Sequence, residues 1–220
     1  MAHEIGNPIG IVLGYLELLK GENLSREERQ DFLERMESEV TRINQIIRDL
    51  LDFSRSSTRV RVDISLHELV TEAIEMLRPQ PMMSHVTIKA ELNAARDSVN
   101  ADPNQLKQVF LNIFINAADA MGEGPGLRSS SSGNMVTVSS QNRGESIELA
   151  FNDNGCGIRR EDLVRIFDPF YTTKEPGKGT GLGLSVCYSI IKGLGGDIRA
   201  ESIQGEGATI IVSIPLSRKE

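Results

Sequence analysis

The run Gly177-Lys178-Gly179-Thr180-Gly181-Leu182-Gly183-Leu184-Ser185 places a glycine at every second position just before an apolar segment. We expect that segment, residues 184–194, to be a helix. Glycines let the backbone present its N–H groups, and N–H groups at a helix N-terminus attract phosphate. The chain contains no GxxxxGK[ST] sequence, so a P-loop is excluded. The run therefore favours a phosphate-binding loop of another kind over a merely flexible glycine loop.

A second glycine cluster, Asp153-Asn154-Gly155-Cys156-Gly157-Ile158, directly follows a segment that we expect to be a strand, residues 147–152. A carboxylate buried at the end of a strand can accept a hydrogen bond from an adenine amino group. The neighbouring glycines would let the backbone approach the base closely. The pattern alone is also typical of a tight turn, so its meaning depends on the other motifs.

A polar pair lies on a helix that we expect to start at Asp102 and Pro103 and to end near Met121. Asn112 and Asn116 are four residues apart, so they share one face of that helix. Two carboxamides that point into one site can bind a hydrated Mg²⁺ ion and phosphate oxygens. The alternative is an ordinary polar helix face.

The N-terminal sequence Ala2-His3-Glu4-Ile5-Gly6-Asn7-Pro8-Ile9 combines a nucleophile with polar neighbours. His3 and Asn7 share a helix face, and Glu4 can hold the second N–H of the imidazole ring. This fixes the tautomer so that the free ring nitrogen can attack phosphorus. The zinc motif HExxH lacks its second histidine here, which argues against a zinc site, and a solvated terminal histidine is the remaining alternative.

The first third of the chain has a helical pattern. Apolar residues step by three and four through residues 5–19 and again through residues 33–50, which is the spacing of a coiled-coil seam. Ser25 and Glu28 form a capping box at the start of the second helix. Two such hairpins would bury their apolar stripes in a four-helix bundle, so we expect a homodimer. The alternative is a hairpin that packs on its own second domain.

The polar stretch Ser54–Thr58 breaks the heptads and marks a domain boundary near residue 60. Beyond it, Ser65 and Glu68 form a second capping box that opens a helix through Leu77. A loop rich in Gly and Ser, expected to be mobile, covers residues 122–134, and one short helix is expected within residues 159–180. The alternating segments predict strands at residues 86–92, 135–139, 147–152, 197–202 and 208–214. The pattern predicts an α+β domain with a helical layer on one face of a mixed sheet.

Composition narrows the classes of function. The formal net charge of -7 argues against a nucleic-acid binder. No stretch approaches the roughly 18 apolar residues of a membrane span, and no signal peptide is visible. Cys156 and Cys187 are too few for a disulfide framework, which fits a reducing cytoplasm. Only Met1 and Ala2 precede His3, so we expect a longer parent protein whose first helix continues upstream and which carries any membrane anchor.

Together these residues resemble the sensor histidine kinases of two-component systems. AHEIGNPI is similar to the family's H box, NIFINAADAM to the N box, DNGCGI to the first glycine box, FDPFYTTK to the F box and GKGTGLGLS to the second glycine box. The HExxNP form resembles the subgroup that includes nitrogen-regulation kinases. The resemblance implies a dimerisation and histidine phosphotransfer hairpin over residues 1–57. It implies a GHKL-type ATP-binding domain, an α/β sandwich, over residues 60–217.

The resemblance also implies a role for individual residues. His3 would be the phospho-acceptor, Glu4 its hydrogen-bonding base and Asn7 a residue that orients water in a reverse, phosphatase reaction. Asn116 would bind Mg²⁺, with support from Asn112. Residues of the glycine boxes would hold ATP: Asp153, Gly155 and Gly157 around the adenine, and Gly179, Thr180, Gly181, Leu182 and Gly183 around the phosphates. Either Lys174 or Lys178 would contact the γ-phosphate, within an ATP lid over residues 159–180.

The implied activity is autophosphorylation of His3 by ATP and transfer to an aspartate of a response-regulator receiver domain. Two other interpretations remain open. A gyrase-like or mismatch-repair-like ATPase would share the nucleotide motifs, but it uses a catalytic carboxylate in the N-box region and lacks the H-box hairpin. A dimeric scaffold could bind nucleotide without catalysis, and a labelling assay would separate it from a kinase.

Overall fold

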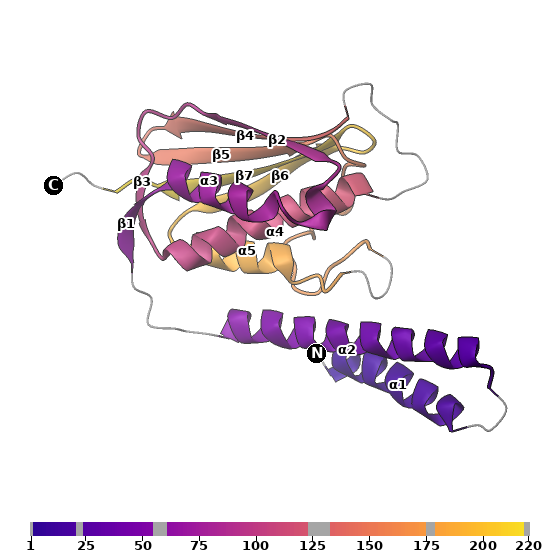
Figure 1. Cartoon of the computed structure of the whole chain (residues 1–220). Helices are drawn as coiled ribbons and strands as arrows, with labels where there is room; N and C mark the ends of the chain where they lie inside the picture. Colours follow the sequence, from indigo (N-terminus) through magenta and orange to yellow (C-terminus); the bar gives the residue numbers. More distant parts are fainter. Residues whose placement is uncertain (1, 21–23, 55–60, 123–132, 175–178, 218–220) are drawn as a thin grey trace. The chain divides into compact units, whose positions relative to one another are not determined.

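The structure is a computed structural model that describes residues 2–20, 24–54, 61–122, 133–174 and 179–217. The chain divides into two compact units. The first comprises Met1–Ser57 with Thr172–Thr180, and the second comprises Thr58–Tyr171 with Gly181–Glu220 (Figure 1). Each unit is described by itself.

The first unit is built on a helical hairpin. Helix α1 spans Ala2–Leu19 and runs antiparallel to helix α2, Arg26–Ser54, as predicted (Figure 1). The capping box is confirmed, because Ser25 Oγ accepts from the Glu28 N–H at 3.1 Å and Glu28 Oε2 accepts from the Ser25 N–H at 2.8 Å. Several apolar side chains of the hairpin stay exposed in a single chain: Ile9, Ile11, Leu13, Leu16, Leu18, Leu33 and Val40.

No helix in the part of the chain that the structure describes is both long and apolar enough to cross a membrane.

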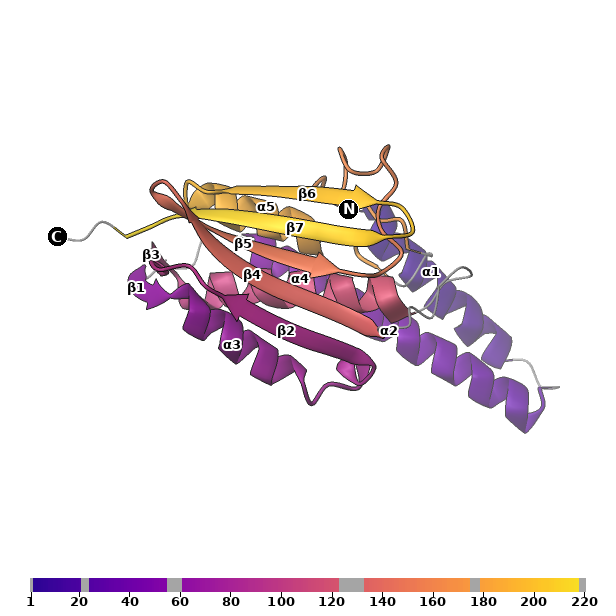
Figure 2. The ribbon, with the colours of Figure 1, turned by 90° about the horizontal axis from the view of Figure 1, so that it is seen from above.

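The second unit is a mixed sheet covered on one face by helices, as the sequence predicts (Figure 2). The strand order is β2-β4-β5-β7-β6; β2 pairs with β4 in parallel, and the other neighbours are antiparallel. The strands are β2 Val86–Leu92, β4 Asn134–Arg143, β5 Ser146–Asp153, β6 Asp197–Ile203 and β7 Gly207–Pro215. The covering helices are α3 Leu66–Leu77, α4 Pro103–Gly122 and α5 Gly183–Gly193.

Three short elements lie outside the sequence prediction. Strands β1 (Val62–Ser65) and β3 (Ser98–Ala101) form a separate two-stranded antiparallel sheet, and η1 (Pro81–Met83) is a 3₁₀ turn. Four residues are too few to give a recognisable alternation, so neither strand has a sequence signal of its own. Ser65 ends β1 and also caps α3, where its Oγ accepts from the Glu68 N–H at 3.2 Å.

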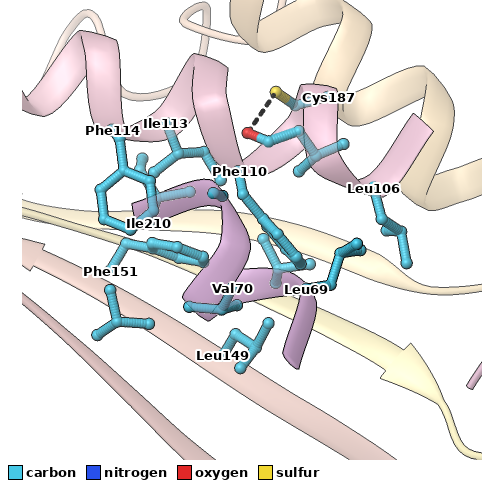
Figure 3. Close-up of a cluster of buried hydrophobic side chains, with 14 of the residues drawn as sticks. Leu69, Val70, Leu106, Phe110, Ile113, Phe114, Leu149, Phe151, Cys187 and Ile210 are labelled. Carbon is cyan, nitrogen blue, oxygen red and sulfur yellow. Dashed lines mark hydrogen bonds between the residues drawn. The ribbon is translucent and has the colours of Figure 1, made fainter. Parts of the chain in front are cut away.

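The core lies between the sheet and the helices. Phe151 on β5 packs edge-on against Phe114 of α4, with 5.4 Å between the ring centroids (Figure 3). The ring centroid of Phe110, also on α4, lies 5.7 Å from that of Phe151. Ile147, Leu149 and Phe151 alternate along β5 and are buried. The same alternation directs Asp153, the last residue of β5, towards the helices.

The prediction of a short helix within residues 159–180 is wrong for the described residues of that segment. Residues 160–167 instead form consecutive turns. The Asp162 N–H donates to the Arg159 carbonyl at 2.9 Å, and the Arg165 N–H donates to the Asp162 carbonyl at 2.8 Å. Pro169 then prevents the residue before it from continuing as a helix. The glycine- and serine-rich loop predicted at residues 122–134 falls mainly on residues 123–132, outside the described residues.

Candidate functional site

The polar pair of α4 lies at the start of α5. Asn112 Nδ2 donates a hydrogen bond of 3.2 Å to the carbonyl oxygen of Gly183, the first residue of α5. A Cβ atom added to Gly183 would lie 3.8 Å from Asn112 Cγ and 3.8 Å from Asn116 Nδ2. Two carboxamides that the sequence places on one helix face therefore meet the end of the second glycine run.

Asp153 is a nearly buried carboxylate, 7% exposed, at the end of β5. Its Oδ1 accepts from the Gly155 N–H at 2.9 Å and from the Ala208 N–H at 3.3 Å. Among the described residues, no group donates to Oδ2. Burial raises the pKa of this carboxyl above its ordinary value, although the two backbone donors oppose that shift. The site thus holds a fixed acceptor with one oxygen available for a ligand amino group.

The first glycine box is packed so tightly that side chains would collide. A Cβ atom on Gly155 would lie 2.8 Å from the carbonyl oxygen of Ala120 on α4, and the next N–H, of Cys156, donates to that same oxygen at 3.1 Å. Gly157 has φ +69°, and its Cβ would lie 2.3 Å from the carbonyl oxygen of Ile203. These glycines bring the turn after β5 against α4 on one side and β6 on the other.

The second glycine run continues directly into α5. Gly181 has φ +67°, and Leu182, which is 3% exposed, occupies the N-cap position without a side-chain capping bond. A leucine side chain cannot accept from the first-turn N–H groups, so this helix start suits an anion. A Cβ atom on Gly179 would lie 3.0 Å from both Thr172 Oγ1 and Lys174 Cδ. Thr180 follows Gly179 and is half-buried, whereas Gly177 and Lys178 lie outside the described residues.

The H-box residues lie on a different unit. His3, Glu4 and Asn7 all belong to α1, so the predicted helical spacing of His3 and Asn7 is present. Asn7 is exposed. The side chains of His3 and Glu4 are outside the described part of the chain.

A charged cluster near the F box has no place in the sequence prediction. The Asp162 carboxylate accepts from the Tyr171 hydroxyl and from Nε of Arg159 at 2.8 Å. These residues lie within the predicted ATP lid, residues 159–180. The sequence alone assigns no role to any of the three. The spacing Arg159-x-x-Asp162-x-x-Arg165 was the available signal, because it alternates charges at turn spacing.

Two parts of the chain match known protein families. Residues 1–59 match the family described as "His Kinase A (phospho-acceptor) domain", and residues 101–218 match "Histidine kinase-, DNA gyrase B-, and HSP90-like ATPase". The chain is 36% identical to signal transduction histidine-protein kinase AtoS of Escherichia coli K12, over 99% of this chain and 34% of that protein. It is 32% identical to sporulation kinase C of Bacillus subtilis 168, over 98% of this chain and 47% of that protein. The chain thus spans between a third and a half of these two relatives.

A solved structure agrees with the sequence comparisons. The crystal structure of histidine kinase ThkA in complex with response regulator protein TrrA superposes with a TM-score of 0.76 and 27% identity. That match covers 98% of this chain and 60% of the ThkA chain. The chain therefore belongs to the sensor histidine kinases, of which it carries the phospho-acceptor part and the ATP-binding part.

Proposed function

We propose that this chain is an ATP-dependent protein histidine kinase that phosphorylates itself on His3 and passes the phosphoryl group to an aspartate of a response regulator. In this proposal residues 1–57 are the dimerisation and phosphotransfer hairpin, and residues 60–217 are the catalytic domain. The observation that carries the proposal is the meeting of Asn112 and Asn116 with the first residue of α5. It supports a site for a triphosphate in the same chain as a phospho-acceptor domain.

Each end of the nucleotide is assigned to a different group of residues. Oδ2 of Asp153 accepts from the adenine amino group, and Gly155 and Gly157, which have no side chains, form the turn beside it. Backbone N–H groups around the phosphates neutralise their charge. We assign that role to the second glycine run, Gly179, Thr180, Gly181, Leu182 and Gly183, and a γ-phosphate contact to Lys174 or Lys178.

The metal part of the proposal rests on donor chemistry. The described residues contain no group of three or more His, Cys, Asp or Glu side chains able to hold a metal ion. Asn116 and Asn112 offer neutral oxygen donors, which suit a Mg²⁺ ion that keeps most of its ligands as water and phosphate oxygens. When bound, Mg²⁺ offsets negative charge on the triphosphate. The roles of Asn116 and Asn112 are to orient the phosphates for in-line attack.

The chemical step transfers the γ-phosphoryl group of ATP to His3. A neutral imidazole nitrogen of His3 attacks the γ-phosphorus, a P–N bond forms, the bond from phosphorus to the bridging oxygen breaks, and ADP leaves. Glu4 accepts the N–H of the other ring nitrogen and stabilises the positive charge that develops on the ring. Phosphohistidine is then the donor to the regulator's aspartate. The solved relative ThkA was crystallised with a response regulator, which supports a receiver domain as the partner.

Two further parts of the proposal concern the hairpin. The exposed apolar side chains of α1 and α2, among them Leu13, Leu18 and Leu33, support a homodimer in which two hairpins bury them.

Asn7 is one turn from His3 on the same helix and is exposed. It can orient a water molecule against the regulator's aspartyl phosphate, so we also propose a phosphatase activity.

Labelling with two forms of ATP tests the proposal. We expect γ-labelled ATP to give protein-bound label that is lost in acid and retained in alkali, and α-labelled ATP to give none. Release of inorganic phosphate without any label on the protein would favour a gyrase-like ATPase instead. Nucleotide binding with neither label nor hydrolysis would favour a non-catalytic scaffold.

A further inference from the structure

Phe170 has an unusual backbone. With φ 66°, it is the one non-glycine residue among those described that has a positive φ. Its N–H donates to the carbonyl oxygen of Gly181 at 2.9 Å, and a Cβ atom on Gly181 would lie 2.4 Å from the carbonyl carbon of Phe170. Left-handed backbone at a bulky residue persists only where its surroundings hold it. Something near Phe170 must therefore stabilise this conformation.

The neighbouring residue supplies the restraint. Tyr171 donates its hydroxyl to Asp162, and the guanidinium group of Arg159 donates to the same carboxylate at 2.8 and 3.3 Å. The guanidinium of Arg165 lies over the Tyr171 ring, 4.4 Å from its centroid. We call these four residues, Arg159, Asp162, Arg165 and Tyr171, the Asp162 latch. Asp162 is 4% exposed, so the latch is anchored inside the domain.

The protonation states of Asp162 and Tyr171 near neutral pH favour the hydrogen bond between them. The hydrogen bonds from Tyr171 and Arg159 lower the pKa of Asp162. The bond to Asp162 raises the pKa of the Tyr171 phenol. Near neutral pH the carboxylate is therefore ionised and the phenol keeps its proton. This is a charge-assisted bond, the strong kind of hydrogen bond in proteins.

The latch connects to the phosphate end of the proposed nucleotide site through few residues. It fixes Tyr171, which adjoins Phe170; Phe170 is bonded to Gly181; and two residues further on lies Gly183, beside Asn112 and Asn116. Asp153, at the proposed adenine end, makes no contact with the latch among the bonds described for it. A change in the latch should therefore affect the two ends of the site differently.

We propose that Asp162 and Tyr171 are positioning residues that hold Phe170 and Gly181 in the backbone conformation needed to bind the triphosphate of ATP. This inference rests on the proposed function of the site. Without the latch, Phe170 relaxes to a negative φ for part of the time, and the bond to Gly181 is lost in those molecules. The apparent dissociation constant for ATP then rises in inverse proportion to the competent fraction. Saturating ATP restores that fraction, so kcat changes little while KM rises.

Single-group variants test the latch. Tyr171→Phe removes one hydroxyl, and Asp162→Asn removes the charge it bonds. We expect each variant to raise both the Kd and the KM for ATP about tenfold, which is the value of one hydrogen bond to a charged group. We expect kcat within about twofold of the parent chain and unchanged binding of adenosine. The double variant should bind ATP less weakly than two independent changes would predict, because both changes act on the same hydrogen bond.

Tyr188→Phe is the matched control. It also removes one phenolic hydroxyl, from a tyrosine on α5 whose ring centroid lies 5.9 Å from that of Phe167. The Tyr188 hydroxyl forms no hydrogen bond with any of the described residues. We expect it to bind ATP like the parent chain.

Three results would overturn the inference. One is an unchanged Kd and KM for ATP with a fall in kcat or in the folded fraction, since that would make the latch structural only. Another is equal weakening of adenosine and ATP, and the third is equal weakening by Tyr188→Phe. Because Kd is measured by direct binding, a parent chain that binds ATP but is never labelled would sink the proposed kinase function and still test the latch. A parent chain that does not bind ATP would sink both.

Discussion

The Asn112 side chain on α4 donates a hydrogen bond of 3.2 Å to the carbonyl oxygen of Gly183, the first residue of α5. These two residues are 71 positions apart in sequence and belong to the two motifs that the nucleotide proposal needs most. The same helices are also joined by the Cys187 thiol, which donates to the Val109 carbonyl at 3.7 Å. The start of α5 is thus held by α4 before any ligand is bound.

Asn112→Ala should lower both the free energy of unfolding and the affinity for ATP. Loss of one half-buried hydrogen bond should lower the free energy of unfolding by about 1 kcal/mol. ATP should also bind more weakly, because the helix start loses its support. Urea unfolding and calorimetric ATP binding measure the two effects. The matched control is Asn100→Ala, which removes a 2.9 Å bond to Asp63 between β1 and β3 and should leave ATP affinity unchanged. Equal affinity in the two variants would contradict the assignment.

Asp153→Asn should weaken ATP binding and stabilise the fold. The new side chain can still accept from Gly155 and Ala208, but its NH₂ group would face the adenine amino group, so two donors would meet. We expect roughly a hundredfold weaker ATP binding, since a charged acceptor is replaced by a donor. Thermal unfolding should shift upward at pH 7 because the variant has no buried charge.

The pH dependence of that stabilisation follows from the raised pKa of Asp153. A raised native pKa means that the native state favours the protonated carboxyl, so the parent chain loses stability as pH rises through that native pKa. The advantage of Asp153→Asn should therefore be largest at neutral pH and should shrink as pH falls towards the ordinary value of 3.8. An advantage that grows on acidification would mean that the carboxylate is stabilising when ionised.

Gly157→Ala should be far more damaging than Gly205→Ala. Both glycines have positive φ, +69° and +86°. A Cβ atom at Gly157 would meet the Ile203 carbonyl oxygen at 2.3 Å, whereas nothing lies within 4 Å of one at Gly205. We expect Gly205→Ala to cost about 1 kcal/mol of unfolding free energy for its backbone alone. Gly157→Ala should cost about 3 kcal/mol or more and should also weaken ATP binding. Similar losses in both would show that the turn relaxes freely.

Asn7→Ala should divide the two proposed activities of the hairpin. Because Asn7 is exposed and one turn from His3, its loss should slow dephosphorylation of a phosphorylated regulator and largely spare labelling of His3. The two rates are measured on the same preparation with a regulator added. Equal loss of both activities would remove the separate role of Asn7.

Periodicity predicted most of the fold because most elements are long enough to repeat. The strand Val86–Leu92 and the helix after Pro103 start where the sequence indicates, and both capping serines, Ser25 and Ser65, accept the predicted N–H bonds. Strand β5 extends one residue beyond its predicted end, to Asp153 itself. Local rules were sufficient for these elements, since caps and alternation depend on near neighbours.

Features that depend on distant partners could not be predicted in this way. The second backbone donor to Asp153 comes from Ala208, 55 residues away, and the oxygen that excludes a side chain at Gly155 belongs to Ala120 on α4. The Asp162 latch lies in the segment where the sequence predicted a short helix, and residues 160–167 form turns there instead. The sequence thus identified the motifs, but not the contacts that hold them in place.

If the nucleotide site phosphorylates His3, then the variant His3→Gln should bind ATP and remain unlabelled. Parent chain and variant are incubated with γ-labelled ATP under identical conditions, and ATP binding is measured on both. We expect acid-labile label that maps to His3 in the parent chain, no label in His3→Gln, and equal ATP affinity in the two. Acid-labile label of similar amount on His3→Gln would contradict it.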